Sequence, residues 1–221
     1  LYKLLKALNF EVYACDPFLA NPELVSLDKV LACDLVTIHV PLSASGQYPT
    51  LNIINESHIE KLSNKILINT SRGEVVSEEL VLQSQDLIYI ADVWMNEPSP
   101  SLKMIETSYI ATPHIAGYSI EGRLNGAKII AKECAKIFKC LKPSETKTVQ
   151  PSAWPYDLNN IVRDIHNVSF PISLFSSELD LKSISDSFKK LSIANLESGF
   201  RFQRESHSPR NDFNSFSFKG I

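Results

Sequence analysis

The sequence lacks the features that mark a membrane protein. No stretch of its 221 residues approaches the roughly 18 uninterrupted apolar residues that a membrane-spanning helix needs. No charged segment followed by an apolar one opens the chain, as a secretory leader would. We therefore expect a cytoplasmic protein without a membrane partner.

An excess of charge of one sign is also lacking. The chain carries 22 Lys and Arg residues and 25 Asp and Glu residues, a formal net charge of -3, with no long run of either sign. Proteins that bind nucleic acids usually display basic patches that attract phosphates. The composition therefore favours no nucleic-acid partner and leaves small anionic molecules as candidate ligands.

Cysteine is sparse and shows no metal-binding pattern. The four cysteines are Cys15, Cys33, Cys134 and Cys140, and no two of them have C-x-x-C spacing. Structural zinc sites and small disulfide-stabilised domains generally depend on closely spaced cysteines. We expect reduced and mostly buried thiols, with neither a disulfide nor a metal site.

The chain does have enough apolar sequence for a sizeable core. Hydrophobic residues make up 44% of it, and 221 residues suit one large domain or one domain with a small appendage. The opening segment, "LYKLLKAL", already shows the i, i+3, i+4, i+7 apolar spacing of a helix. Because this helix is under way at the first residue, we expect the sequence to be part of a longer protein.

Five strand-like segments repeat along the first half of the chain. They are rich in β-branched and aromatic residues and nearly continuous in hydrophobicity, as strands covered by helices on both faces are. Helix-like segments that begin with Ser or Asn, such as "SLDKVLA", "NESHIEKLS" and "SEELVLQSQ", separate them. This alternation predicts an α/β fold with a parallel sheet. The strands are expected at residues 10–16, 33–40, 65–71, 87–93 and 108–114.

Polar or ionisable residues gather where these strands end. The segments finish at or beside Asp16, Val40, Arg72, Asp92 and His114, and His39 directly precedes the second of these. In open α/β sheets, ligands bind in the crevice beyond the carboxyl ends of the strands. A single polar residue at a strand end is ordinarily a turn former or a solvated side chain. The agreement of all five strand ends instead predicts a binding site at this edge.

Three residues near this edge form a set that suits oxidation of a 2-hydroxy acid. Arg72 supplies a permanent forked cation that fits a carboxylate, and Glu97 in "DVWMNEP" supplies a carboxylate. His114 in "TPHIAGYS" is a side chain of the type that exchanges protons near neutral pH, so it can take the proton of a hydroxyl. We predict Arg72, Glu97 and His114 as the catalytic residues.

Such an oxidation needs a hydride acceptor, and Asp16 indicates which one. In a dinucleotide-binding fold, an acidic residue at this point hydrogen-bonds the adenosine ribose hydroxyls. A carboxylate there favours NAD, because it would repel the 2′-phosphate of NADP. The other half of the fingerprint, G-x-G-x-x-G, is absent from the sequence. We expect it upstream of Leu1.

The segments "CDLVTIHVPLS", "INTSRGEVV", "DVWMNEP" and "TPHIAGYS" resemble, in order and spacing, those of the D-isomer-specific 2-hydroxyacid dehydrogenases. The resemblance implies a Rossmann-like, doubly wound parallel sheet, truncated at its start, as the NAD-binding domain of residues 1–118. It implies that Arg72 holds the substrate carboxylate and hydroxyl. It also implies that Glu97 orients His114, which donates and accepts the proton.

The same resemblance assigns ligand contacts. It implies that NAD contacts Asp16, Val40, Asp92 and Gly117, and that the substrate contacts Tyr118. The run "AGYSIEG" resembles members that act on a phosphorylated 2-hydroxy acid. That phosphate requires a second cation, because a dianion buried without a partner would cost several kcal/mol.

The arginines of the tail are candidates for this second cation. They are Arg201, Arg204 and Arg210, and the segment "HSPRNDF" around the last of them resembles an arginine-bearing segment near the end of family members. We expect Arg210 to reach across a dimer to the phosphate. The alternative, an ordinary solvated arginine, stays open.

The second half of the chain is predicted to contain three parts. Residues 119–142 show helical spacing and form a crossover helix, and residues 143–155 are rich in proline and form a linker. Residues 156–221 resemble the family's small C-terminal α+β domain, with a helix at "SISDSFKKL" and a strand at "GFRFQRE". A domain this small gains stability by packing against its copy, so a homodimer is expected.

Three functions are compatible with these residues. The first is an NAD-dependent dehydrogenase of a phosphorylated 2-hydroxy acid, and the second is a related enzyme that acts on another 2-hydroxy acid, such as phosphoglycerate. The third is a non-catalytic protein that senses dinucleotides or forms oligomers. The presence of both His114 and Glu97 favours the enzymes, because a binding module needs no acid/base pair.

Overall fold

The structure of the protein is a computed structural model, and it describes residues 1–7, 9–138 and 179–207. The chain divides into two compact units. The first contains Leu1–Ile115 and Asp180–His207, and the second contains Ala116–Leu179 and Ser208–Ile221. Each unit is described by itself.

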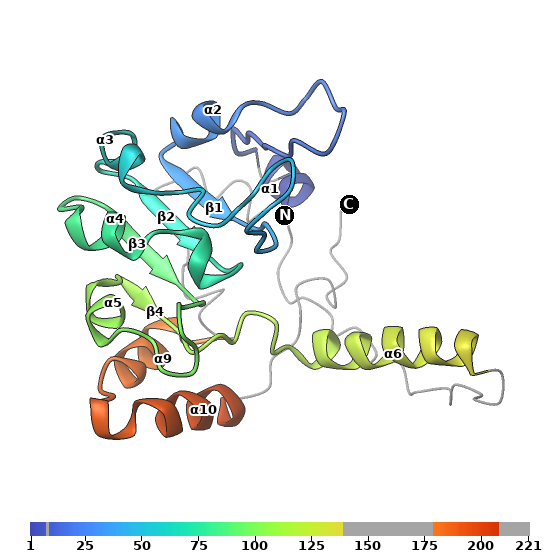
Figure 1. The fold of residues 1–221 in the computed structure, drawn as a ribbon, viewed down its shortest axis with the longest axis vertical. Helices are drawn as coiled ribbons and strands as arrows, with labels where there is room; N and C mark the ends of the chain where they lie inside the picture. The colour runs from blue at the N-terminus through green and yellow to red at the C-terminus, as the bar shows by residue number, and fades with distance from the viewer. Residues whose placement is uncertain (8, 139–178, 208–221) are drawn as a thin grey trace. The chain divides into compact units, whose positions relative to one another are not determined.

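A four-stranded parallel sheet forms the centre of the first unit (Figure 1). The strands run in the order β1 (Leu35–Ile38), β2 (Ile66–Asn69), β3 (Ile88–Ala91) and β4 (Ile110–Ala111). All three neighbouring pairs are parallel. The predicted parallel α/β fold is therefore confirmed, and all four strands lie inside predicted segments.

The strand predicted at residues 10–16 is not present. The segment belongs to no named strand, although the carbonyl of Ala14 accepts a hydrogen bond from the backbone N–H of Val25. Residues 10–16 correspond to the second strand of a Rossmann fold. That strand pairs with the first strand of the fold, which precedes it in the sequence, and does not pair with the fourth. Among the described residues, no strand precedes residues 10–16, so the backbone there has no ladder to join.

Short helices lie before and between the strands, as the Ser- and Asn-initiated segments predicted. They are α2 (Leu27–Leu31), α3 (Ile59–Leu62), α4 (Glu78–Gln83) and α5 (Leu102–Thr107), and α1 (Tyr2–Ala7) precedes them. Figure 1 shows α3, α4 and α5 stacked along one side of the sheet.

Serine side chains begin two of these helices. Ser26 accepts a hydrogen bond from the N–H of Lys29, and Ser101 accepts one from the N–H of Met104. The predicted N-cap Ser77 behaves differently, because its hydroxyl donates to the Glu56 carboxylate.

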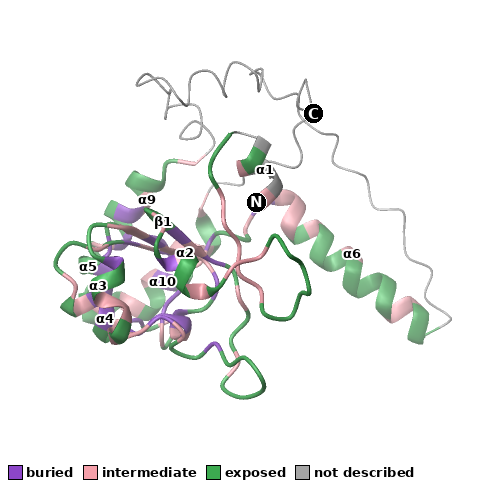
Figure 2. Cartoon of the chain, turned by 90° about the horizontal axis from the view of Figure 1, so that it is seen from above, coloured by how far each residue is buried: buried purple, intermediate pink, exposed green. Residues whose placement is uncertain are grey.

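The core lies between the sheet and these helices. Alternate strand residues are buried, and the register aligns them in rows such as Val36, Leu67 and Tyr89. Apolar side chains from every helix of α2 to α5 complete the same cluster: Leu31, Leu62, Leu80, Val81, Met104 and Ile105. Figure 2 shows these buried residues gathered inside the unit, with exposed residues around them. Because successive side chains of a strand point to opposite faces, every second residue of these strands contributes to the core.

Two helices from late in the chain complete the first unit. These are α9 (Leu181–Phe188) and α10 (Leu196–Ser206), and α9 packs against β4 (Figure 1). The hydroxyl of Ser185 accepts a hydrogen bond from the N–H of Ala111 at 3.0 Å, and the Lys189 ammonium donates to the Ser108 carbonyl. Side chains of α9 and of the residue after it therefore form hydrogen bonds with backbone groups at the edge of the sheet.

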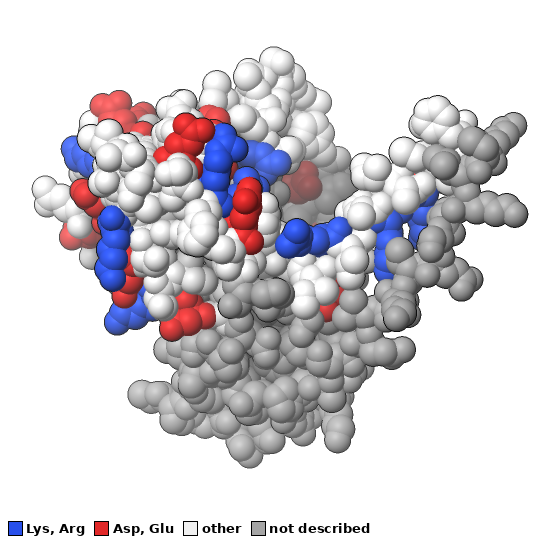
Figure 3. All heavy atoms as spheres, turned by 90° about the horizontal axis from the view of Figure 1, so that it is seen from below, with Lys and Arg blue, Asp and Glu red and all other residues white. Residues whose placement is uncertain are grey.

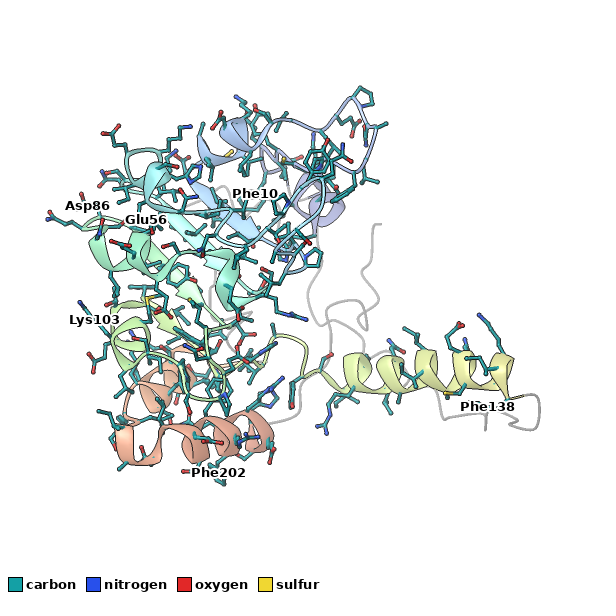
Figure 4. The ribbon with its side chains drawn as sticks, in the orientation of Figure 1. Phe10, Glu56, Asp86, Lys103, Phe138 and Phe202 are labelled. Atoms are coloured by element: carbon teal, nitrogen blue, oxygen red, sulfur yellow. The ribbon has the colours of Figure 1, made fainter. Side chains whose placement is uncertain are left out.

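The predicted strand at "GFRFQRE" is wrong, because these residues lie in α10. Phe200 is buried against Phe188, with ring centroids 5.6 Å apart, whereas Phe202 is 69% exposed. Figure 4 shows Phe202 on the outer side of α10. Two residues along a helix correspond to about 200° of rotation, which separates the two rings as a strand would not. The predicted helix at "SISDSFKKL" is present as α9.

The predicted C-terminal domain boundary also differs from the structure. Residues 180–207 belong to the same compact unit as the sheet. Phe188 and Phe200 are buried in the same core cluster as Leu67, which explains this grouping. The predicted linker at 143–155, together with Arg210, lies outside the described residues.

The second unit contains the long helix α6 (Ile120–Ile137), which lies within the segment predicted to be helical, residues 119–142. Ser119 caps it by accepting a hydrogen bond from the N–H of Gly122 at 2.9 Å.

Neither α6 nor any other described helix is long and apolar enough to cross a membrane. On the face seen in Figure 3, Lys and Arg side chains of the described residues lie among Asp and Glu side chains.

Candidate active site

Arg72 follows β2 in a loop that Asn69 organises. The Asn69 side chain is fully buried, accepts hydrogen bonds from the N–H and hydroxyl of Ser71, and donates to the Arg72 carbonyl at 2.9 Å. The Arg72 side chain itself is exposed, and its Nη1 donates to the Ser71 carbonyl at 2.6 Å. In the described part of the chain no carboxylate pairs with this guanidinium. The remaining N–H groups can therefore serve an anionic ligand.

The Arg72 loop lies directly against the loop after β3. Gly73 is buried, and a Cβ atom on it would lie 2.0 Å from the carbonyl carbon of Trp94. The N–H of Trp94 in turn donates to Glu97 Oε1 at 2.9 Å. Backbone contact thus connects the position of Arg72 to that of the Glu97 carboxylate.

Glu97 and His114 form a hydrogen-bonded pair. His114 Nδ1 lies 2.7 Å from Glu97 Oε2, and the side chains are 26% and 21% exposed. An ionised carboxylate only accepts, so Nδ1 carries the hydrogen and Nε2 of the neutral ring keeps its lone pair. The pair can therefore take a proton through Nε2 while Glu97 holds the ring.

Asp92 holds the backbone segment that carries His114. It is buried, and its Oδ1 accepts hydrogen bonds from the Thr112 hydroxyl at 2.6 Å and from the Ile115 N–H at 2.8 Å. Trp94 Nε1 also donates to the Thr112 carbonyl at 2.9 Å. Two residues of the β3 loop therefore fix both sides of His114.

A family of known proteins matches the part of the chain that carries this geometry. The family model described as "D-isomer specific 2-hydroxyacid dehydrogenase, NAD binding domain" matches residues 1–116. The chain belongs to this family. The matched range includes Arg72, Glu97 and His114.

Individual dehydrogenases of known name are also similar. An erythronate-4-phosphate dehydrogenase of Cellvibrio japonicus (strain Ueda107) is 41% identical over 144 residues, which cover 62% of this chain and 38% of that protein. One of Shewanella halifaxensis (strain HAW-EB4) is 29% identical over 223 residues, which cover 96% of this chain and 58% of that protein. The chain thus spans less than two thirds of the length of these relatives.

A solved structure of the family has a similar fold. The NAD-complexed D-isomer specific 2-hydroxyacid dehydrogenase of Lactobacillus delbrueckii ssp. bulgaricus is 25% identical, with a TM-score of 0.55. The similarity covers 66% of this chain and 51% of that chain.

The family implies NAD, and two of the predicted contact residues suit it. Asp16 is half-buried, and its Oδ1 accepts one hydrogen bond, from the N–H of Phe18 at 3.0 Å. A carboxylate has about four acceptor positions, so ribose hydroxyls can still bind there. Val40 packs against the core cluster just beyond β1 and can offer an apolar contact.

The other predicted ligand contacts have different surroundings. Asp92 is engaged with Thr112 and Ile115, so its observed contacts are structural. Gly117 and Tyr118 belong to the second unit, in which the Arg123 guanidinium lies 5.4 Å from the centre of the Tyr118 ring. Within the first unit the structure pairs Glu97 with His114 and places the loop of Arg72 against the loop that follows β3.

Several residues that shape the site were missed by sequence reasoning. Asn69 and Trp94 carry a local signal, because each places a polar group inside or beside an apolar strand. Arg204 carries no such signal, since it lies 90 residues after the His114 carbonyl to which it donates. Among the described residues no group of three or more His, Cys, Asp or Glu side chains could hold a metal ion.

Proposed function

We propose that the full-length protein oxidises 4-phospho-D-erythronate to its 2-oxo acid with NAD, as a step of pyridoxal 5′-phosphate biosynthesis. The observation that carries the reaction type is the 2.7 Å contact of His114 with Glu97, next to a loop that presents Arg72. The substrate rests on the names of the similar proteins from C. japonicus and S. halifaxensis.

Arg72 binds the substrate in this proposal. Its exposed guanidinium offers paired N–H groups that match the two oxygens of a carboxylate. Because Asn69 fixes the Arg72 backbone, substrate binding does not have to order this loop. The C2 hydroxyl is thereby oriented for proton transfer.

His114 removes the proton of that hydroxyl. Nε2 accepts it while Nδ1–H remains hydrogen-bonded to Glu97, and the carboxylate stabilises the imidazolium that forms. In the reverse direction the same nitrogen returns the proton to the oxygen. When bound, NAD would supply the acceptor for the hydride of C2, and Asp16 would hold its adenosine ribose.

The phosphate end of the substrate requires a further cation. Of the candidates in the tail, Arg201 pairs with Glu197 at 3.1 Å, and Arg204 donates to the His114 carbonyl. Arg210 lies outside the described residues and remains our candidate. Loss of activity of Arg210→Ala with 4-phosphoerythronate, but not with an unphosphorylated 2-hydroxy acid, would support it, whereas equal or no loss with both would exclude it.

A homodimer is part of the proposal, with the C-terminal part of the chain at the interface. Because residues 180–207 pack on the sheet, the informative deletion removes only residues 208–221. Sedimentation of the full-length protein should give a dimer and that of the deletion variant a monomer. A dimer of unchanged affinity after the deletion would place the interface elsewhere.

Steady-state kinetics of the full-length protein test the function. We expect NADH formation with 4-phosphoerythronate at a kcat/KM well above that with phosphoglycerate or lactate. Higher efficiency with phosphoglycerate would favour the related enzyme. NAD binding in calorimetry without turnover of any of the three acids would favour a dinucleotide sensor.

A further inference from the structure

The peptide bond between His114 and Ile115 is held at both ends by charged side chains. Arg204 Nε donates to the His114 carbonyl at 3.1 Å, and the Ile115 N–H donates to Asp92 Oδ1 at 2.8 Å. Charge-assisted hydrogen bonds are about twice as strong as neutral ones. We call this arrangement the peptide clamp, formed by Asp92, Arg204 and the 114–115 peptide.

His114 needs such support because its backbone is in an unfavourable region. Its φ angle is 57°, in the left-handed region that residues other than glycine rarely adopt because it is sterically strained. The orientation of the peptide that follows His114 sets its ψ angle. The clamp therefore fixes the backbone from which the imidazole reaches Glu97.

The fold delivers Arg204 to this peptide through α10. Phe200 is buried against Phe188, whose ring centre lies 5.7 Å from that of Trp94. Arg204 follows Phe200 by one helical turn and so lies on the same face of α10. Gln203 adds a hydrogen bond to the Ser187 carbonyl at 3.2 Å. The anchored helix positions the guanidinium of Arg204, which is half-buried.

We propose that Arg204 is a positioning residue for His114. It acts through the His114 carbonyl and keeps the imidazole aligned for proton transfer, without itself binding substrate or NAD. The proposal rests on the proposed dehydrogenase function. It also assigns Arg204 a role other than phosphate binding, for which its position in the tail made it a candidate.

Kinetics of variants of the full-length protein test the proposal. Arg204→Gln should lower kcat by about 10- to 100-fold, because a small misplacement of a catalytic group has an effect of this size. The KM values for NAD and 4-phosphoerythronate should change by less than about twofold. Arg204→Lys should recover part of kcat, since an ammonium can also donate to a carbonyl. Added guanidinium should restore part of the activity of Arg204→Ala.

Arg201 is the matched control, because it lies on the same helix and is 60% exposed in its ion pair with Glu197. Arg201→Gln should leave kcat unchanged. An unchanged kcat in Arg204→Gln would overturn the proposal, as would a rise in KM confined to phosphorylated substrates. If Arg204→Gln does not fold, Arg204→Lys decides: a reduced kcat with unchanged KM for NAD in a fully folded variant supports the clamp, whereas a wild-type kcat or a loss of NAD affinity opposes it.

Hydrogen exchange separates this proposal from the proposed function. The amide hydrogen of Ile115 should exchange faster in Arg204→Gln than in the wild type and Arg201→Gln, while amides of β2 keep their protection. Faster exchange in a protein that oxidises no 2-hydroxy acid would retain the clamp and reject the dehydrogenase. Unchanged exchange would reject the clamp whatever the activity.

Discussion

Gly73 lies in contact with the peptide bond that follows Trp94. A Cβ at position 73 would lie 2.0 Å from the Trp94 carbonyl carbon and 2.3 Å from the Met95 nitrogen. No side chain fits into this space, so the loop with Arg72 and the loop with Glu97 can meet only because residue 73 is glycine. The lack of space for a Cβ atom therefore explains why residue 73 is glycine.

Gly73→Ala should lower both stability and turnover. The added methyl group must push the two loops apart, which we expect to cost about 1–3 kcal/mol of unfolding free energy. Turnover should fall because Arg72 and Glu97 separate. Gly126→Ala is the control, since Gly126 lies within α6 with nothing within 4 Å of an added Cβ. Equal effects of the two substitutions in thermal unfolding and kinetics would contradict the steric argument.

His114→Asn should lower the turnover of the full-length enzyme by about 10²-fold or more while NAD binding survives. The amide cannot accept and return a proton as the imidazole does. Glu97→Gln should cause a smaller loss, because the glutamine can still hold the ring but does not stabilise the imidazolium. Single-turnover kinetics and NAD calorimetry check both variants, and near-normal turnover of His114→Asn would remove this residue from the mechanism.

Phe188→Ala should destabilise the protein by about 3–5 kcal/mol. The ring is fully buried between Trp94 and Phe200, so its removal leaves a cavity beneath the candidate active site. Phe202→Ala serves as the control, because that ring is 69% exposed and should contribute little. Urea unfolding of both variants measures the difference. Similar losses would show that α9 and α10 do not belong to the core of the first unit.

Asp16→Asn should weaken the preference for NAD over NADP. The substitution removes the negative charge that repels a 2′-phosphate but retains hydrogen-bonding groups for the ribose. The ratio of kcat/KM for the two cofactors, measured with the full-length enzyme, checks this effect. A ratio equal to that of the wild type would mean that another group excludes the phosphate.

Cys15 offers an independent test of the Asp16 charge. Burial raises the pKa of the Cys15 thiol, and the neighbouring Asp16 carboxylate raises that pKa further. Only the thiolate is alkylated, so the rate for Cys15 should be low at neutral pH and rise with pH until its pKa is passed. Asp16→Asn lowers this pKa and should speed alkylation at neutral pH, as read by mass spectrometry. The rate for Cys33 in the same samples is the control and should stay constant.

The sheet could be predicted from the sequence because its strands have a clear pattern of their own. The segments around Leu67 and Tyr89 are apolar and rich in residues with high strand propensity, and a segment with a helical pattern follows each of them. Both form strands. Residues 10–16 have a similar composition but form no strand, because strand formation also depends on a neighbouring backbone. Composition alone therefore overpredicted one strand.

The C-terminal helices were harder to predict because their partners lie far away in the sequence. In "GFRFQRE", alternation of Phe200 and Phe202 is typical of a strand, whereas a helix buries only the first ring. The candidate residues at the strand ends could be selected from the sequence by their chemistry. The hydrogen bond from Arg204 to the His114 carbonyl could not be predicted, because a local sequence pattern carries no information on contacts between distant segments.

The cover of β4 by α9 has a consequence for how the protein is made. The hydroxyl of Ser185 engages the N–H of Ala111, a residue that the ribosome adds 74 positions earlier. At roughly 5–20 residues per second, about 4–15 s separate the synthesis of the two residues. During this interval the nascent chain presents an uncovered strand edge, which can pair with another chain. A folding helper that binds nascent chains should therefore be needed most between the synthesis of β4 and that of α9.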